Sequence, residues 1–389
     1  MMNLDRSKRW RSSIFAAVVA ALIFMPLFLM EVYAGTKGDS DFPTHLLWAM
    51  DIKSGRPVPA YVMAHSAWQF LVLAFNTILG LSSRGAELIS ILLCVGLSAG
   101  ILTWWFWPTL VEAGLPLWRV VVVVLGLNIA APVALWWFSD HELYLGYVGI
   151  ISYHNPTIIM LRPLALLQFM YALRGFSARP VSKISVWVSG LVSLLSTFAK
   201  PNLAICLLPA LVLLVLFRLI RKERVNLLFL VLGILIPTAG MLAWQFLLSY
   251  HSTDSTHVIF APFGVIGAYS HDLAPKFLLS ILFPLLVKVF YWKQASHNLT
   301  LVFAWLVFIF GAFFTYFVAE SSIRFKDGNF TWSGEIALFL LFAAATLFFL
   351  SIPKASRSLK WSARALWILQ VDAGVVYYIF FTLHILYIV

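Results

Sequence analysis

The chain has 389 residues, of which 62% are hydrophobic and only 11% are charged, and its mean hydropathy is +0.92. Soluble domains carry about a quarter charged residues, so this composition excludes an ordinary water-soluble fold and predicts that lipid covers much of the surface. The net charge of +11 does not indicate a nucleic-acid partner, because basic cytoplasmic loops give a membrane protein the same excess. The two cysteines, Cys94 and Cys206, are too few for a disulfide framework or a cysteine metal cluster.

The first apolar stretch follows a basic N-terminal segment, so it is expected to begin in the cytoplasm and to be retained as a signal anchor. Further apolar stretches of about spanning length follow along the whole chain. The predicted spans are 13–33, 85–107, 118–138, 157–174, 184–199, 202–220, 226–248, 276–292, 299–318, 335–352 and 365–388. We therefore predict an all-α, polytopic transmembrane protein of about 11 spans, with residues 1–389 in one transmembrane domain. A multi-pass position in a bacterial inner (plasma) membrane, with a cytoplasmic N-terminus, is expected.

Residues 61–82 are also apolar enough to span, but counting them as a span reverses the sidedness of everything after them. The basic residues between Arg174 and Arg224 would then face outward, against the positive-inside rule. His65, Gln69 and Asn76 recur at spacings of four and seven, which puts them on one helical face. We predict a juxtamembrane helix on the outer face. With this choice most acidic residues and histidines gather outside, which the positive-inside rule does not explain.

The first outer loop, residues 38–45, holds two carboxylates and an imidazole within seven residues. Asp41 and His45 are four apart, so a helix beginning near Pro43 brings them close to one face. A partly dehydrated carboxylate such as Asp41 or Asp39 can act as a general base. Alternatively, either residue caps the helix that follows.

A second polar group contains Asp140, His141 and Glu142, and then His154 and Asn155. Arg162 lies seven residues after Asn155, on the same face of the next predicted span. An arginine inside a span usually faces a cavity or a partner, and it can bind a phosphate through two hydrogen bonds. The alternative is that Arg162 extends to the outer interface.

Two further groups lie near predicted outer span ends. Lys200 joins two short apolar runs, so it is expected at the bottom of an outward-facing cavity, or else as an ordinary turn lysine. Arg324, Asn329 and Trp332 combine a turn with an aromatic surface suited to stacking on a sugar, or else Trp332 belongs to an interfacial aromatic belt. The loop 249–275 shows no tight metal-ligand spacing, so no metal ligands and no cofactor are assigned, and a requirement for a divalent cation stays open.

This layout resembles the GT-C superfamily of membrane glycosyltransferases. A first span is followed by an acidic outer loop, juxtamembrane helices and many further spans, over about residues 1–220. The stretch from Asp41 to His45 resembles the Asp-Glu-x-x-Tyr stretch of the lipid A aminoarabinose and protein mannosyl transferases, with Phe42 in place of Glu and His45 in place of Tyr. The stretch from Leu195 to Pro209 resembles their Thr-Lys-Gly stretch, with two extra residues and Pro201 in place of Gly. Residues 221–389 resemble the family only in hydrophobicity and outer loops.

The resemblance implies transfer of a sugar from a polyprenyl-phosphate carrier to a glycan or lipid acceptor on the extracytoplasmic face, with inversion at the sugar carbon. Asp41 would be the general base, with Asp39 as second choice. Lys200 and Arg162 would hold the lipid phosphate as the leaving group departs. Other residues expected to bind substrate are His45, His154, Asn155, Arg324, Asn329 and Trp332. Membrane lipids are the remaining expected partners.

Three alternatives stay open. A transporter or flippase of lipid-linked sugars needs repeated halves and ionisable residues near the membrane midplane. The sequence shows no repeat, and Asp372 is the one deep acid among the predicted spans. A polysaccharide polymerase would share the lipid-linked substrate but favours a larger late outer loop than 249–275. A non-catalytic membrane assembly subunit is the third alternative.

Overall fold

The computed structural model describes residues 2–34, 40–112, 114–135, 146–149, 153–177, 180–250, 256–352 and 357–388. Helices dominate these ranges, which confirms the predicted all-α class, and one short two-stranded ribbon is added. The helices of the first half are α1 Met2–Ala34, α2 Phe42–Ser54, α3 Ala60–Met63, α4 Ala67–Ile78, α5 Ser83–Glu112, α6 Leu117–Ile129, α8 Pro156–Arg174 and α9 Lys183–Ala199. Those of the second half are α10 Asn202–Ile220, α11 Leu227–Leu230, π-helix η2 Val231–Leu235, α12 Ile236–Tyr250, α13 Gly264–Tyr269, α14 Leu273–Ser280, α15 Leu282–Phe290, α16 Trp292–His297, α17 Leu299–Phe317, 3-10 helix η3 Ser322–Asp327, α18 Thr331–Ser351 and α19 Arg357–Ile388.

Eight helical segments among the described residues are long and apolar enough to cross a membrane, and a bent pair makes up to nine. The chain is therefore built as an integral, multi-pass membrane protein. The eight segments are Arg6–Tyr33, Ser83–Glu112, Pro156–Arg174, Asn202–Ile220, Leu227–Tyr250, Leu299–Phe317, Ser322–Ser351 and Ser358–Leu383. The predicted number of about 11 is larger because three predicted spans are not single long helices.

Proline explains two of these differences. The helix expected over 118–138 ends at Ile129, because Pro132 has no N–H group and the residue before a proline avoids helical geometry. The span expected over 276–292 is two helices, α14 and α15, bent by 72°. Pro284 cannot donate to the carbonyl of Ser280, so the helix breaks at Ile281 between them. The third predicted span, 184–199, forms the helix α9 of 17 residues, about 25 Å long.

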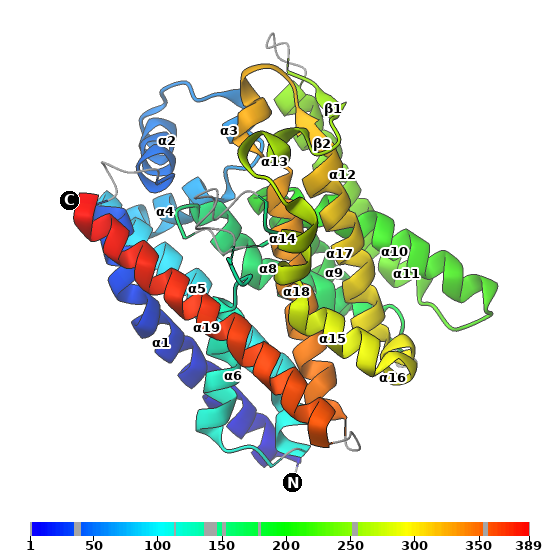
Figure 1. Cartoon of the computed structure of the whole chain (residues 1–389). Coiled ribbons are helices and arrows are strands. Elements are labelled where there is room, and N and C mark those ends of the chain that lie inside the picture. Colours follow the sequence, from blue (N-terminus) through cyan, green and yellow to red (C-terminus); the bar gives the residue numbers. More distant parts are fainter. Residues whose placement is uncertain are drawn as a thin grey trace.

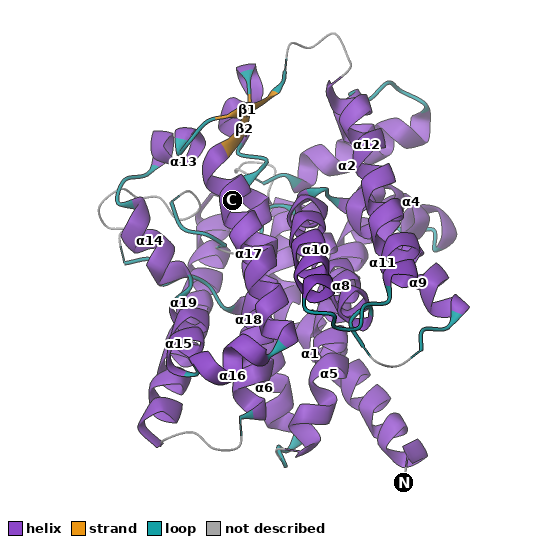
Figure 2. Ribbon diagram, turned by 90° about the vertical axis from the view of Figure 1, so that its right-hand side faces the viewer, coloured by secondary structure: helices purple, strands orange, loops and turns teal. Residues whose placement is uncertain are grey.

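The stretch 61–82 forms two short helices, α3 and α4, instead of one. Helix α4 has 12 residues, about 18 Å, which is too short to cross a bilayer. Both views place α2, the two strands and α13 at one end of the molecule, with the N-terminus at the opposite end (Figures 1 and 2). If the N-terminus is cytoplasmic, this end is the outer one, as predicted for the acidic loop and for residues 61–82.

Helices α17 and α18 pack closely, and a glycine permits the approach. A Cβ atom on Gly311 would lie 2.7 Å from the backbone oxygen of Ser333. Since Ser333 is in the first turn of α18, this contact fixes where Trp332 and Glu335 stand. The residues of α18 are buried along almost the whole length of the helix.

Two short strands close the outer end. Strand β1 (Val258–Phe260) pairs antiparallel with β2 (Val318–Glu320), with Val258 opposite Glu320. Strand β2 follows α17, and the Tyr250 hydroxyl at the end of α12 donates to Glu320 of this strand. Glu320, at the end of β2, is thereby placed among polar groups from other helices.

Candidate functional site

The side chain of Asp41 bonds to the start of another helix and not to its own helix. It stands at the N-cap position of α2, but its side chain makes no cap hydrogen bond. Instead, the Asn155 amide donates from Nδ2 to Asp41 Oδ2 over 2.7 Å, and Asp41 N donates to His154 O over 3.0 Å. The Asp41 carboxylate is therefore held in place by the start of α8 and is not used to cap α2. Asp39 lies outside the described residues.

Asn155 is fixed by its role as the N-cap of α8. Its Oδ1 accepts from the backbone N–H groups of Thr157 and Ile158, each over 3.1 Å, and from the Thr157 hydroxyl over 2.7 Å. Asn followed by Pro at the first helical position is a strong start signal for a helix. Because Oδ1 is used for the cap, the amide nitrogen must point toward Asp41.

Lys200 stands at the junction of α9 and α10. Its Nζ donates to Thr157 Oγ1 over 2.8 Å and lies 4.9 Å from the centre of the Trp332 ring. Exclusion of water by the surrounding protein lowers the pKa of Lys200 to about 8, while the Asp41 and Glu335 carboxylates oppose the shift. The ammonium form therefore predominates near pH 7 and is available to an anion.

Two histidines complete the surroundings of Asp41 and Lys200. The His154 ring lies 6.0 Å from the Trp332 ring, centre to centre. His45 Nδ1 is 2.9 Å from Gln69 Nε2, which joins α2 to α4. Burial lowers the pKa of His45 to about 3, and the positive charge of Lys200 acts in the same direction. His45 is therefore neutral near pH 7.

A cavity of about 330 Å³ opens beside Lys200. One part of its wall is apolar and comes mainly from α10 and α12; the other part is polar. The apolar part includes Pro201, Ile205, Leu242, Phe246, Val258 and Phe330, and the polar part includes His65, Lys200, Asn202, Gln245, Ser249, Tyr250, Glu320, Arg324 and Asn329. Such a wall suits a ligand that carries a hydrocarbon chain and a polar, anionic head.

Glu320 organises the polar wall. Its carboxylate accepts from Arg324 Nη2 over 3.0 Å, from the Tyr250 hydroxyl over 2.6 Å and from Asn329 Nδ2 over 2.5 Å. Arg324 also lies over the Tyr61 ring, at 4.8 Å from its centre. Three donors converge on this one carboxylate, so Glu320 orients its neighbours. Its charge also compensates that of Arg324.

Several members of this site were not among the predicted substrate-binding residues. Thr157 and Glu320 lie within four residues of predicted residues in the sequence, and the helical spacing of His65 with Gln69 was a usable signal. Tyr250 and Gln245 had no signal, because they end or continue an apolar stretch. The structure places two sets of predicted residues together, and Lys200 belongs to both. The set that surrounds Lys200 is Asp41, His45, His154, Asn155 and Trp332. The set that lines the cavity is Lys200, Arg324 and Asn329.

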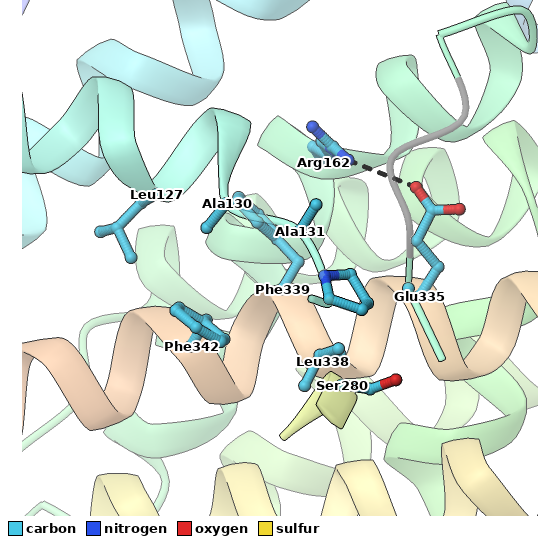
Figure 3. A pocket seen from close by; sticks show the side chains of 11 residues that line it. Leu127, Ala130, Ala131, Arg162, Ser280, Glu335, Leu338, Phe339 and Phe342 are labelled. Atoms are coloured by element: carbon cyan, nitrogen blue, oxygen red, sulfur yellow. Dashed lines mark hydrogen bonds and ion pairs between the residues drawn. The ribbon is translucent and has the colours of Figure 1, made fainter. Parts of the chain in front are cut away.

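Arg162 does not join Lys200 in the cavity, contrary to the prediction. It is only 5% exposed and forms an ion pair from Nη2 to Glu335 Oε1 over 3.3 Å (Figure 3). Its Nη1 donates to Asn128 O over 3.3 Å. It lines two pockets of about 20 Å³ and about 10 Å³, each with room for about one water molecule. The physical reason is its depth. A cation buried inside a helical bundle needs a carboxylate partner within the protein itself, also when no substrate is bound.

No group of three or more histidine, cysteine, aspartate or glutamate side chains suited to a metal ion occurs within the described residues. Asp140, His141 and Glu142 lie outside those residues, as do His251 and Asp254 of the loop 249–275. The described site brings together the Asp41 carboxylate, the Lys200 ammonium and the cavity between helices.

No protein-family model, no curated protein and no solved structure matches this chain. The resemblance to GT-C glycosyltransferases therefore remains a prediction from the sequence.

Proposed function

We propose that this protein is a membrane glycosyltransferase of GT-C type, which moves a sugar from a polyprenyl-phosphate carrier to a glycan or lipid acceptor on the extracytoplasmic face. One observation carries the proposal: a carboxylate and an ammonium from distant parts of the chain are linked through α8, and the ammonium borders a cavity with an apolar wall. A lipid-linked sugar needs these three features together.

The donor is assigned to the cavity. Its prenyl chain would lie along the apolar wall formed by residues such as Ile205, Leu242 and Phe246. Its phosphate would pair with Lys200, because Arg324 is already compensated by Glu320. The sugar would meet the Trp332 ring and the polar wall, since aromatic rings stack on sugar faces.

The reaction is a single displacement with inversion. Asp41 accepts the proton of the acceptor hydroxyl, and the hydroxyl oxygen forms a bond to the anomeric carbon. The bond from that carbon to the phosphate oxygen breaks, and the electron pair leaves with the polyprenyl phosphate. Lys200 stabilises the negative charge that develops on this leaving group.

The test uses purified protein in proteoliposomes with a panel of polyprenyl-phosphate sugars, and it measures release of polyprenyl phosphate. Asp41→Asn should lower the rate about 100-fold or more while donor binding persists. Asp51→Asn is the matched control, because Asp51 lies on the same helix and pairs with Arg56 at the surface. Full activity in both Asp41→Asn and Asp39→Asn would overturn the assignment of the base.

A second candidate, transport of lipid-linked sugars, is favoured by the buried Arg162–Glu335 pair between α8 and α18. Asp372, the acid expected to serve transport, is exposed on α19. The pockets beside Arg162 are too small to pass a sugar in this conformation. One comparison separates the two candidates. If the protein is a transporter, Glu335→Gln should stop the flux of a lipid-linked sugar and Asp41→Asn should not. If it is a transferase, Asp41→Asn should lower the rate of sugar transfer more than Glu335→Gln.

A further inference from the structure

Thr157 connects the two charged groups of the site. It lies in the first turn of α8 and is 2% exposed. Its hydroxyl accepts a hydrogen bond from Lys200 Nζ over 2.8 Å and donates one to Asn155 Oδ1 over 2.7 Å. Asn155 in turn donates to Asp41 over 2.7 Å. A continuous chain of three hydrogen bonds therefore runs from the ammonium to the carboxylate.

The direction of every bond in this chain is determined. Asn155 Oδ1 accepts from two backbone N–H groups, so the amide cannot be turned around without losing the cap of α8. Lys200 can only donate, so the Thr157 oxygen faces it with a lone pair and the hydroxyl hydrogen points to Asn155. All three bonds thus run in the same sense, from cation to anion, and bonds aligned in this way strengthen one another.

We propose that Thr157 is a positioning residue of the transferase site, whose hydroxyl fixes the Lys200 ammonium relative to the Asp41 carboxylate. The inference rests on the proposed function. Thr157 is not among the residues that line the cavity, so it acts through Lys200 and Asn155 and not by contact with the donor. Its hydroxyl keeps the half-buried ammonium in place and in its charged form, ready for a phosphate.

The chain offers a matched set of variants. Thr157→Val keeps the shape of the side chain and removes the hydroxyl, whereas Thr157→Ser keeps the hydroxyl and removes the methyl group. Both leave the backbone N–H of residue 157 to complete the Asn155 cap. Thr157→Ala removes the hydroxyl with a different change of shape and should repeat the effect of Thr157→Val.

The experiment measures binding of geranylgeranyl phosphate, and of geranylgeraniol as the uncharged reference, to purified protein from about pH 6 to about pH 9. The native protein should bind the phosphate more tightly than the alcohol. Thr157→Val should weaken phosphate binding about tenfold at neutral pH, the effect of losing one charge-assisted hydrogen bond, and leave the alcohol unchanged. Thr157→Ser should stay within about twofold of the native protein, which is less than such a bond contributes.

The pH profile separates positioning from a general loss of structure. An oxygen that accepts from an ammonium stabilises its charged form, so removal of the hydroxyl lowers the pKa of Lys200 further. Phosphate affinity should then disappear at a lower pH in Thr157→Val than in the native protein. The other charged and titratable groups around Lys200 are the same in both proteins: Asp41, His45, His65, Arg324 and Glu335.

Two results would overturn the inference while the proposed function stands. In the first, native protein prefers the phosphate and Thr157→Val keeps both its affinity and its pH profile. In the second, Thr157→Ser loses as much affinity as Thr157→Val, which would make side-chain shape the cause. Equal binding of phosphate and alcohol by the native protein would overturn the proposed function and this inference with it.

Discussion

At the scale of single residues, the site separates charged groups from neutral ones. Lys200 carries the available positive charge, whereas two histidines near it are kept neutral. Burial lowers the pKa of His65 to about 3, with the charges of Lys200 and Arg324 acting in the same direction, and His45 behaves alike. Neutral imidazoles do not compete with Lys200 for an anion, and they do not repel the positive charge of its ammonium group.

These histidines predict a pH dependence of stability. In the unfolded chain a histidine has a pKa near 6.5. Below that pH, His45 and His65 are protonated in the unfolded state but stay neutral in the folded state, which favours unfolding. Their contribution is complete above about pH 6.5 and is lost progressively as the pH falls toward 3. These two histidines should therefore add nothing to the change in the thermal unfolding midpoint from about pH 8 to pH 7, and should lower the midpoint progressively below about pH 6.5.

His65→Gln should flatten this fall, because the variant lacks one of the two groups. His271→Gln is the control, since His271 is exposed on the loop before α14. An unchanged slope in His65→Gln, or an equal change in His271→Gln, would contradict the explanation.

At the scale of elements, the site depends on where helices begin. The starts of α2, α8, α10 and α18 converge, and each brings one or two polar groups: Asp41, Asn155 with Thr157, Asn202, and Trp332. Asn202 Nδ2 donates to the backbone oxygen of Asn329 over 2.8 Å and to Ser333 Oγ over 2.9 Å, which ties α10 to α18. Helix packing therefore controls the geometry around Lys200.

The contact of α17 with α18 can be tested with one methyl group. Gly311→Ala would place a Cβ 2.7 Å from the backbone oxygen of Ser333, so one helix must move. We expect a loss of about 2 kcal/mol in the free energy of unfolding and weaker phosphate binding, because Trp332 moves with α18. Gly240→Ala on α12 meets nothing within 4 Å and should change stability by less than about 1 kcal/mol. Equal effects of the two substitutions on unfolding in detergent would show that the close approach does not matter.

At the scale of the whole molecule, the proposal needs the site on the outer face. Ser54, at the end of α2, and Glu112, at the end of α5 nearest the N-terminus, are both exposed. A membrane-impermeant maleimide applied to intact cells should label Ser54→Cys and not Glu112→Cys. The native Cys94 and Cys206 are buried, so the background should be low. Labelling of Glu112→Cys alone would place the site in the cytoplasm and exclude an extracytoplasmic transferase.

Composition and local spacing predicted much of this molecule. The lengths of the apolar stretches identified the membrane class and most helices, because each segment that crosses a lipid bilayer must by itself be apolar and long enough. The short α3 and α4 match the expectation that residues 61–82 do not form one spanning helix. The polar stretches around Asp41, His154 and Lys200 stood out because an apolar chain shows its polar exceptions clearly.

The tertiary structure alone decided which exceptions meet. Asp41 and Asn155 are 114 residues apart, and Arg162 and Glu335 are 173 apart, so no spacing in the sequence relates them. The sequence therefore assigned Arg162 to the phosphate, whereas folding gave it a buried carboxylate and left Lys200 beside the cavity. The physical reason is that periodicity reports which side of its own helix a residue occupies, while the choice of partner depends on how separate helices pack.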